Sequence, residues 1–192
     1  EMWRQEASGF SGVWGTPILV PINDDRTDLV IAVPNEIWGF NPANGELVWY
    51  CKTMENRSFC SSVVAHDGVI YAVESGPGGG GGIAVKAGGT GDVTDSHVLW
   101  SGRQRNRIGT PLYHNGRLYT FSGGMATCFD AQSGDQVYRA RLRGGRNAGG
   151  GRSQDYASPI LAGDLIYFTS RGGAVYVIQA ADEYLQLGVN RV

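Results

Sequence analysis

One hairpin-like stretch occurs twice in the sequence and constrains the fold more than any other feature. Residues 38–49 read as a short apolar strand, the turn Asn44-Gly45 and a second strand that ends in Trp49. Asn-Gly between apolar runs favours a two-residue hairpin, because a type I′ turn needs positive φ at both central positions. Residues 126–138 repeat this plan, with Ser133-Gly134 as the turn and Tyr138 in place of the Trp. The chain is therefore predicted to be a repeat protein.

Aromatic residues near the end of each unit give the period of this repeat. Successive positions are separated by 38 to 51 residues, and they are Trp3, Trp49, Trp100, Tyr138 and Tyr184. A period of this size is typical of a propeller blade with four antiparallel strands. No unit has convincing helical periodicity. The sequence thus predicts an all-β fold, a β-propeller with about four blades.

A second marker locates the start of each blade. A small hydroxyl residue precedes Pro and an apolar strand at Thr16-Pro17, Thr110-Pro111 and Ser158-Pro159, and Ser61-Ser62 takes the same place without Pro. Proline is tolerated at the first residue of a strand, because its missing donor falls outside the ladder. We expect one propeller domain over residues 1–192, with residues 1–5 as the outer strand of a preceding blade. The blades are predicted at 16–52, 61–103, 110–143 and 158–192.

Composition and charge exclude several classes of function. The formal net charge of −2 argues against a nucleic-acid-binding protein, which would normally carry a basic excess. No run of about 18 apolar residues is present, so membrane insertion is not expected. The three cysteines have no metal-site spacing. Cys51 and Cys60 flank a loop and could form a disulfide, although free thiols in buried strands are the favoured interpretation.

Residues 37–49 resemble the tryptophan-docking repeat of PQQ-like β-propellers, and residues 129–138 retain its Asp-Ala and Gly positions. The whole chain is similar to bacterial repeat proteins of this family, including BamB-type outer-membrane assembly proteins. The resemblance implies that Trp3, Trp49, Trp100 and Tyr138 pack between neighbouring blades. It also implies a protein or peptide partner and a periplasmic or cell-envelope location, with a cytoplasmic location left open. A Tyr hydroxyl buried at such a position would require a partner.

Propellers of this family close with six to eight blades, whereas the sequence supplies four. Three explanations are open. The chain could be part of a longer protein, two copies could complete an eight-bladed ring through their open seams, or the four blades could close on themselves. A chain that starts at Glu1 in an outer strand without its own blade favours the first explanation.

Residue patterns that carry catalysis are absent from the sequence. His66, His97 and His114 lack metal-ligand spacing, and no Gly-x-Ser-x-Gly elbow occurs. The resemblance also extends to quinone-dependent dehydrogenases. These enzymes use adjacent cysteines, a Trp floor, calcium and a catalytic Asp. This chain has no adjacent cysteines. We therefore expect no catalytic residues, no metal and no cofactor. The alternative is a dehydrogenase domain, in which PQQ and calcium would be bound.

A binding site in such a propeller is expected at the mouth of the central channel, just before each innermost strand. The residues at these places are Trp14, Arg57, Ser58, Arg107, Asp155 and Tyr156. Arginine and aromatic side chains that converge at one rim could hold an extended peptide or an anionic ligand. The simpler interpretation is that they pack and solvate the rim. The sequence-based hypothesis is a non-catalytic interaction scaffold.

Overall fold

A computed structural model describes residues 2–55, 58–76, 79–144 and 155–191. The described residues form four sheets, each built on four antiparallel strands, which are the blades of a partial β-propeller. Blade 1 contains β1 (Ile18–Asn23), β2 (Arg26–Val33), β3 (Glu36–Phe40) and β4 (Leu47–Lys52); blade 2 contains β5 (Val64–His66), β6 (Val69–Gly76), β7 (Gly79–Lys86) and β9 (Val98–Gly102). Blade 3 contains β10 (Leu112–His114), β11 (Arg117–Ser122), β12 (Met125–Asp130) and β13 (Gln136–Arg141); blade 4 contains β14 (Ile160–Ala162), β15 (Leu165–Thr169), β16 (Ala174–Gln179) and β17 (Gln186–Arg191).

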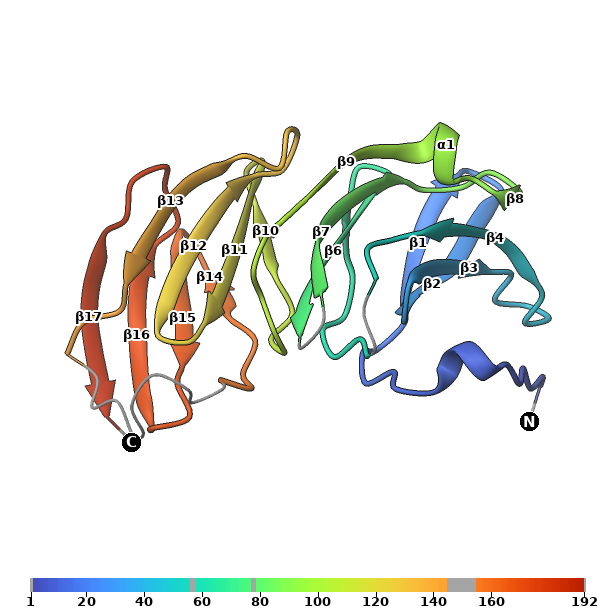
Figure 1. Ribbon diagram of the computed structural model, residues 1–192. Coiled ribbons are helices and arrows are strands. Elements are labelled where there is room, and N and C mark those ends of the chain that lie inside the picture. The colour runs from blue at the N-terminus through green and yellow to red at the C-terminus, as the bar shows by residue number, and fades with distance from the viewer. Residues whose placement is uncertain (1, 56–57, 77–78, 145–154, 192) are drawn as a thin grey trace.

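The blades stand side by side in an open arc, with blade 1 and blade 4 at its two ends (Figure 1). The predicted all-β propeller fold is therefore confirmed. The described residues contain little helix, a 3-10 turn at Ser8–Phe10 and the short α1 at Thr94–His97. The α1 turn follows β8 (Gly91–Asp92), which pairs in parallel with β4 and adds a fifth strand to the sheet of blade 1. Among the described residues, no helix has the length and apolar character needed to cross a bilayer.

The hairpin turns differ from the expectation at Asn44-Gly45. Gly45 has φ +73°, but Asn44 is not among the residues with positive φ, so this turn is not type I′. The loop closes instead through Gly45 N–H to Asn41 O and Asn41 N–H to Glu46 O, each at 2.8 Å. Positive φ at both central residues occurs at Asp67-Gly68 and Asn115-Gly116, in the hairpins between the first and second strands of blades 2 and 3. The two-residue turn chemistry therefore lies at the inner hairpins.

The described glycines of the Gly-rich run at 76–82 lie in paired strands. Gly79–Gly82 are part of β7 and pair with β6, as Gly76 with Gly79 and Val73 with Gly82. A Cβ at Gly81 would lie 2.0 Å from Gly102 O. Glycine is required there because the neighbouring strand approaches closely.

The hydrophobic core consists of three seams between blades. Alternating residues of each middle strand face the next sheet, so apolar side chains interdigitate across each gap. Val30, Ile37 and Trp49 of blade 1 pack with residues of blade 2, including Ile70 and Val85. Separate clusters join blade 2 to blade 3 and blade 3 to blade 4.

Two tryptophans bind the outer hairpin of a following blade in the same way. Trp3 Nε1–H donates to Pro42 O at 2.8 Å, and its ring lies where a Cβ at Gly45 would be. Trp100 Nε1–H donates to Ala131 O at 2.8 Å, and its ring lies against Gly134. Glycine in each hairpin therefore lets the ring pack directly on the backbone.

The docking residues of blades 1 and 3, Trp49 and Tyr138, do not make the hydrogen bond to the next hairpin that Trp3 and Trp100 make. Trp49 is fully buried at the seam, but its Nε1–H donates to Asp28 Oδ2 of its own blade at 2.7 Å. The Tyr138 hydroxyl is buried without a hydrogen-bond partner among the described residues, and burial raises the pKa of Tyr138. The hydroxyl therefore lacks the partner that the sequence reasoning required.

The fourth docking position is not Tyr184. Strand register pairs Gly39 with Trp49, Ala84 with Trp100, and Cys128 with Tyr138, each just before a bulge. The equivalent pair in blade 4 is Val177 with Gly188. Tyr184 continues the aromatic spacing of the sequence, but the strand register, and not the residue count, decides which side chain faces the seam.

The N-terminal residues form no strand between 2 and 7 in the structure, unlike the expected outer strand at 1–5. A strand needs a neighbouring backbone to pair with, and residues 2–7 pair with no strand. The residues that follow them lie on the outward face of blade 1. Phe10 and Val13 pack there against Ile31, Val33 and Phe40. Phe10 meets the Trp38 ring edge-on, with centroids 5.4 Å apart.

Candidate binding surface at the inner rim

One end of the blades carries the connections that lead into the innermost strands. Because each sheet is antiparallel, the turns between second and third strands lie at this same end. We call it the connecting face. The predicted rim residues that the structure describes, Trp14, Ser58, Arg107, Asp155 and Tyr156, belong to connections on this face that lead into β1, β5, β10 and β14.

A ladder of hydroxyl hydrogen bonds joins the connections at the inner edge. Thr16 N–H donates to Ser62 Oγ at 2.9 Å, Ser62 N–H to Thr110 Oγ1 at 3.0 Å, and Thr110 N–H to Ser158 Oγ at 2.9 Å. Each blade thus offers a backbone donor to the hydroxyl of the next blade. We call these contacts the hydroxyl ladder. It explains why the repeated marker contains Ser or Thr.

The residue before each hydroxyl is small because the connections nearly touch. A Cβ at Gly15 would lie 2.6 Å from Ser61 O, and one at Gly109 would lie 2.6 Å from Ala157 O. Any larger side chain would push neighbouring blades apart. The sequence reasoning found this marker but attributed it to strand geometry at Pro, and it missed the contact between blades.

Trp14 and Tyr156 present large exposed aromatic surfaces on this rim, and they hold equivalent positions two residues before the ladder. Trp14 is 76% exposed, and its backbone N–H donates to Phe59 O at 2.8 Å. Tyr156 is 57% exposed, and the Arg171 guanidinium carbon lies 5.5 Å from its ring centre. The backbone of Trp14 is therefore fixed by a hydrogen bond, and both aromatic rings face solvent.

Other predicted rim residues are less accessible. Asp155 is buried, and its Oδ1 accepts the backbone N–H of Arg171 at 3.1 Å, which fastens the β15–β16 turn. Ser58 and Arg107 are half-buried. Arg57 lies outside the described residues. The arrangement therefore differs from a convergent cluster of six exposed side chains.

Glu74 is a buried carboxyl that the sequence reasoning did not single out. Its Oε2 accepts the backbone N–H groups of Cys60 at 2.9 Å and Ser61 at 3.1 Å. Burial raises the pKa of Glu74, while those hydrogen bonds and the charge of Arg107 oppose the shift. Glu74 therefore holds the connection before β5 in place. A charged residue ending the apolar run Val69–Val73 was the available signal.

The described residues do not form an evident catalytic centre. Cys51, Cys60 and Cys128 are free thiols at separate positions. Burial raises the pKa of Cys51 to about 11 and that of Cys128 to about 12, so neither thiol is activated as a nucleophile. His66 stacks on Tyr113, with ring centres 4.2 Å apart. Within the described part of the chain, no group of three His, Cys, Asp or Glu side chains could hold a metal ion.

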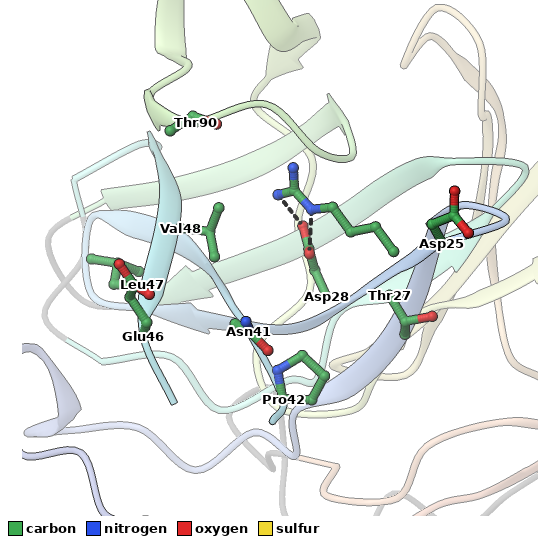
Figure 2. A pocket seen from close by; sticks show the side chains of 10 residues that line it. Asp25, Thr27, Asp28, Asn41, Pro42, Glu46, Leu47, Val48 and Thr90 are labelled. Carbon is green, nitrogen blue, oxygen red and sulfur yellow. Dashed lines mark hydrogen bonds and ion pairs between the residues drawn. The ribbon is translucent and has the colours of Figure 1, made fainter. Parts of the chain in front are cut away.

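A second candidate is a groove of about 700 Å³ beside the outer hairpin of blade 1 (Figure 2). At its base Asp28 accepts two hydrogen bonds from Arg26, at 2.8 Å each, and the one from Trp49. Arg26 also donates to Gly89 O of blade 2 at 3.0 Å. Asp28 is hydrogen-bonded to both Arg26 and Trp49 within the protein. These three residues therefore stabilise the seam between blades 1 and 2 and do not form a ligand site.

Comparison with known proteins identifies the repeat. The family described as outer membrane protein assembly factor BamB matches residues 1–183. BamB from Moraxella catarrhalis superposes with a TM-score of 0.63 at 11% identity, over 93% of this chain and 48% of that protein. No curated protein matched by sequence.

Two enzymes share the same fold. A quinohemoprotein alcohol dehydrogenase from Pseudomonas putida superposes with a TM-score of 0.70 at 15% identity, over 99% of this chain and 35% of the enzyme. The enzyme of the same description from Comamonas testosteroni gives a TM-score of 0.65 at 12% identity, over 94% and 35%. The chain therefore spans about half of the BamB structure and about a third of each dehydrogenase.

Proposed function

The chain belongs to the BamB-type family of PQQ-like β-propeller repeat proteins, and from this premise we propose that it is a non-catalytic scaffold that binds a protein partner. The observation that carries the proposal is the pair of exposed aromatic residues, Trp14 and Tyr156, on the connecting face. Exposed aromatic side chains on rigid backbone are typical anchors of protein interfaces.

The chemistry of the rim favours an extended peptide segment with apolar and acidic side chains. Trp14 and Tyr156 offer flat apolar surfaces, and the exposed Arg171 adds a positive charge beside the second ring. An extended segment can contact separated anchors because its side chains recur at regular intervals. The description of the family as an outer membrane protein assembly factor supports an assembly role in the periplasm or cell envelope.

Quinone-dependent oxidation is less well supported by the residues present. The described side chains contain no adjacent thiols, and the buried carboxylates Asp28 and Asp155 are engaged in contacts within the protein. Taken together, these side chains are not a set of donors that fits the quinone and its calcium ion. We derive no catalytic step from them.

Selection from a peptide library displayed on phage tests the scaffold proposal. Selected peptides should bind Trp14→Ala and Tyr156→Ala at least about tenfold more weakly, as expected for the loss of an interface anchor. Leu99→Ala is the matched control, because Leu99 is also exposed but lies on the outer strand of blade 2. Peptides that bind all three variants as tightly as the parent would contradict the proposal.

A further inference from the structure

The connection from blade 2 to blade 3 carries arginine at every second residue. It runs from the end of β9 to β10 (Figure 1) and contains Arg103, Arg105 and Arg107. The residues between them, Gln104 and Asn106, are buried, whereas Arg103 and Arg105 are exposed. This alternation is typical of an extended segment whose two faces differ, so Arg103 and Arg105 face solvent on one side.

Gln104 anchors this segment to both blades. Its Oε1 accepts the backbone N–H of Gly82 in blade 2 at 3.1 Å, and its Nε2–H donates to Gly134 O in blade 3 at 2.6 Å. A Cβ at Gly82 would lie 2.8 Å from Gln104 Oε1, so glycine is needed for this close approach. The backbone that displays Arg103 and Arg105 is therefore held at the seam between blades 2 and 3, and both blades of this seam belong to the described residues.

Two further arginines stand on the side of blade 3 that faces blade 2. In β13, Arg139 pairs with Thr127 of β12, and directly opposed residues of an antiparallel pair share a face of the sheet. Thr127 lies two positions before Phe129, which packs in the cluster between blades 2 and 3, so both point the same way. Arg141, two positions after Arg139, shares that face, and both arginines are exposed. We call the following four residues the basic seam: Arg103, Arg105, Arg139 and Arg141.

The basic seam differs from the other arginines of the seams in having no carboxylate partner. Arg26 and Arg117 are ion-paired with aspartates of their own or a neighbouring blade, at 2.7 to 2.8 Å. In the part of the chain that the structure describes, no carboxylate forms an ion pair with a member of the basic seam. The basic seam therefore presents positive charge that is not neutralised within the described residues.

We propose that the basic seam binds an acidic segment of a protein partner, at a surface separate from the aromatic residues of the rim. In an extended peptide, alternate carboxylates lie about 7 Å apart on one face, which is also the spacing of alternate arginines in an extended segment. A guanidinium group can form two parallel hydrogen bonds with one carboxylate, so each arginine suits one acidic side chain. The net charge of −2 disfavours a long polyanion such as a nucleic acid, because the whole protein repels it.

Fluorescence anisotropy with labelled synthetic peptides tests the proposal on the 192-residue chain. The probe is a peptide of about ten residues in which Glu alternates with Thr, so that its carboxylates share one face when it is extended. It contains no aromatic or large apolar side chain, so its binding reports on charge and not on the aromatic residues of the rim. The probe should bind with a Kd of about 1 mM or tighter, and a Lys-Thr peptide of the same length should not bind.

The variants remove the basic seam one pair at a time. Replacing Arg103 and Arg105 together with Gln should weaken binding of the Glu-Thr peptide about fivefold or more, as should Arg139→Gln with Arg141→Gln. Arg103→Lys with Arg105→Lys keeps the charge and should bind the peptide more tightly than the Gln variant. Circular dichroism verifies that each variant is folded.

Arg4→Gln with Arg191→Gln is the matched control. Both residues are exposed, they lie in the N-terminal segment and in blade 4, and their replacement removes the same charge. This variant should bind the Glu-Thr peptide as tightly as the parent does.

Several results would overturn the proposal. These are a Glu-Thr peptide that does not bind at about 1 mM, a Lys-Thr peptide that binds equally well, and a control variant that is weakened as much as the variants of the basic seam. Tighter binding of a single-stranded RNA of equal length would also overturn it, because the surface would then be a nucleic-acid site.

Discussion

Replacing Tyr138 with Phe should stabilise the protein, although the residue lies at a seam between blades. The Tyr138 hydroxyl is buried without a partner among the described residues, while its ring packs edge-on against Tyr184 with centroids 5.7 Å apart. A buried polar group without a hydrogen bond costs about 1–3 kcal/mol. Tyr138→Phe removes that cost and keeps the ring contact, so we expect a gain of about 1 kcal/mol.

Urea unfolding followed by tryptophan fluorescence measures the effect. With a denaturant slope of about 2 kcal/mol per molar, a gain of about 1 kcal/mol raises the midpoint by about 0.5 M. The slope itself should not change, since the surface exposed on unfolding is almost the same.

Tyr184→Phe is the matched control at the same seam. The Tyr184 hydroxyl donates to Gln186 Oε1 at 2.7 Å, and Gln186 in turn binds the backbone of Arg143. Loss of this hydrogen bond should cost about 1 kcal/mol and lower the midpoint by about 0.5 M. If Tyr138→Phe lowered the midpoint as Tyr184→Phe does, the hydroxyl would have a partner and the reasoning would fail.

Three further predictions concern the seams and the ladder. Trp49→Ala should cost about 3–5 kcal/mol in urea unfolding, because a fully buried ring is removed; a variant as stable as the parent would contradict the assigned seam. Thr110→Ala should cost about 1 kcal/mol by removing the acceptor of Ser62 N–H, and Thr110→Ser should restore it; equal stability of the two variants would exclude the hydroxyl contact. Glu74 has a raised pKa in the folded state, so the stability it contributes is complete below the unfolded pKa and is lost as pH rises through the folded value. Relative to Glu74→Gln, the parent should therefore lose stability as pH rises above about 4.5, and parallel pH profiles would refute this account.

Local sequence patterns determined the fold class and the approximate blades. Hairpin turns, aromatic spacing and alternating apolar residues are short-range signals that each blade expresses on its own. The docking role expected of Trp3 and Trp100 came from a resemblance to a known repeat, and in the structure each ring lies against a glycine of a hairpin.

Tertiary structure alone decided the contacts that cross the seams. The aromatic spacing continued to Tyr184, but the strand register places Gly188 at the position in blade 4 that corresponds to the docking residues. The partner of Trp49 is Asp28, 21 positions away, and the hydroxyls of the ladder meet residues 46 to 48 positions away. Turn chemistry acts between neighbours in the chain, whereas seam contacts depend on how whole sheets pack. The sequence by itself does not specify the distance or the register between two packed sheets.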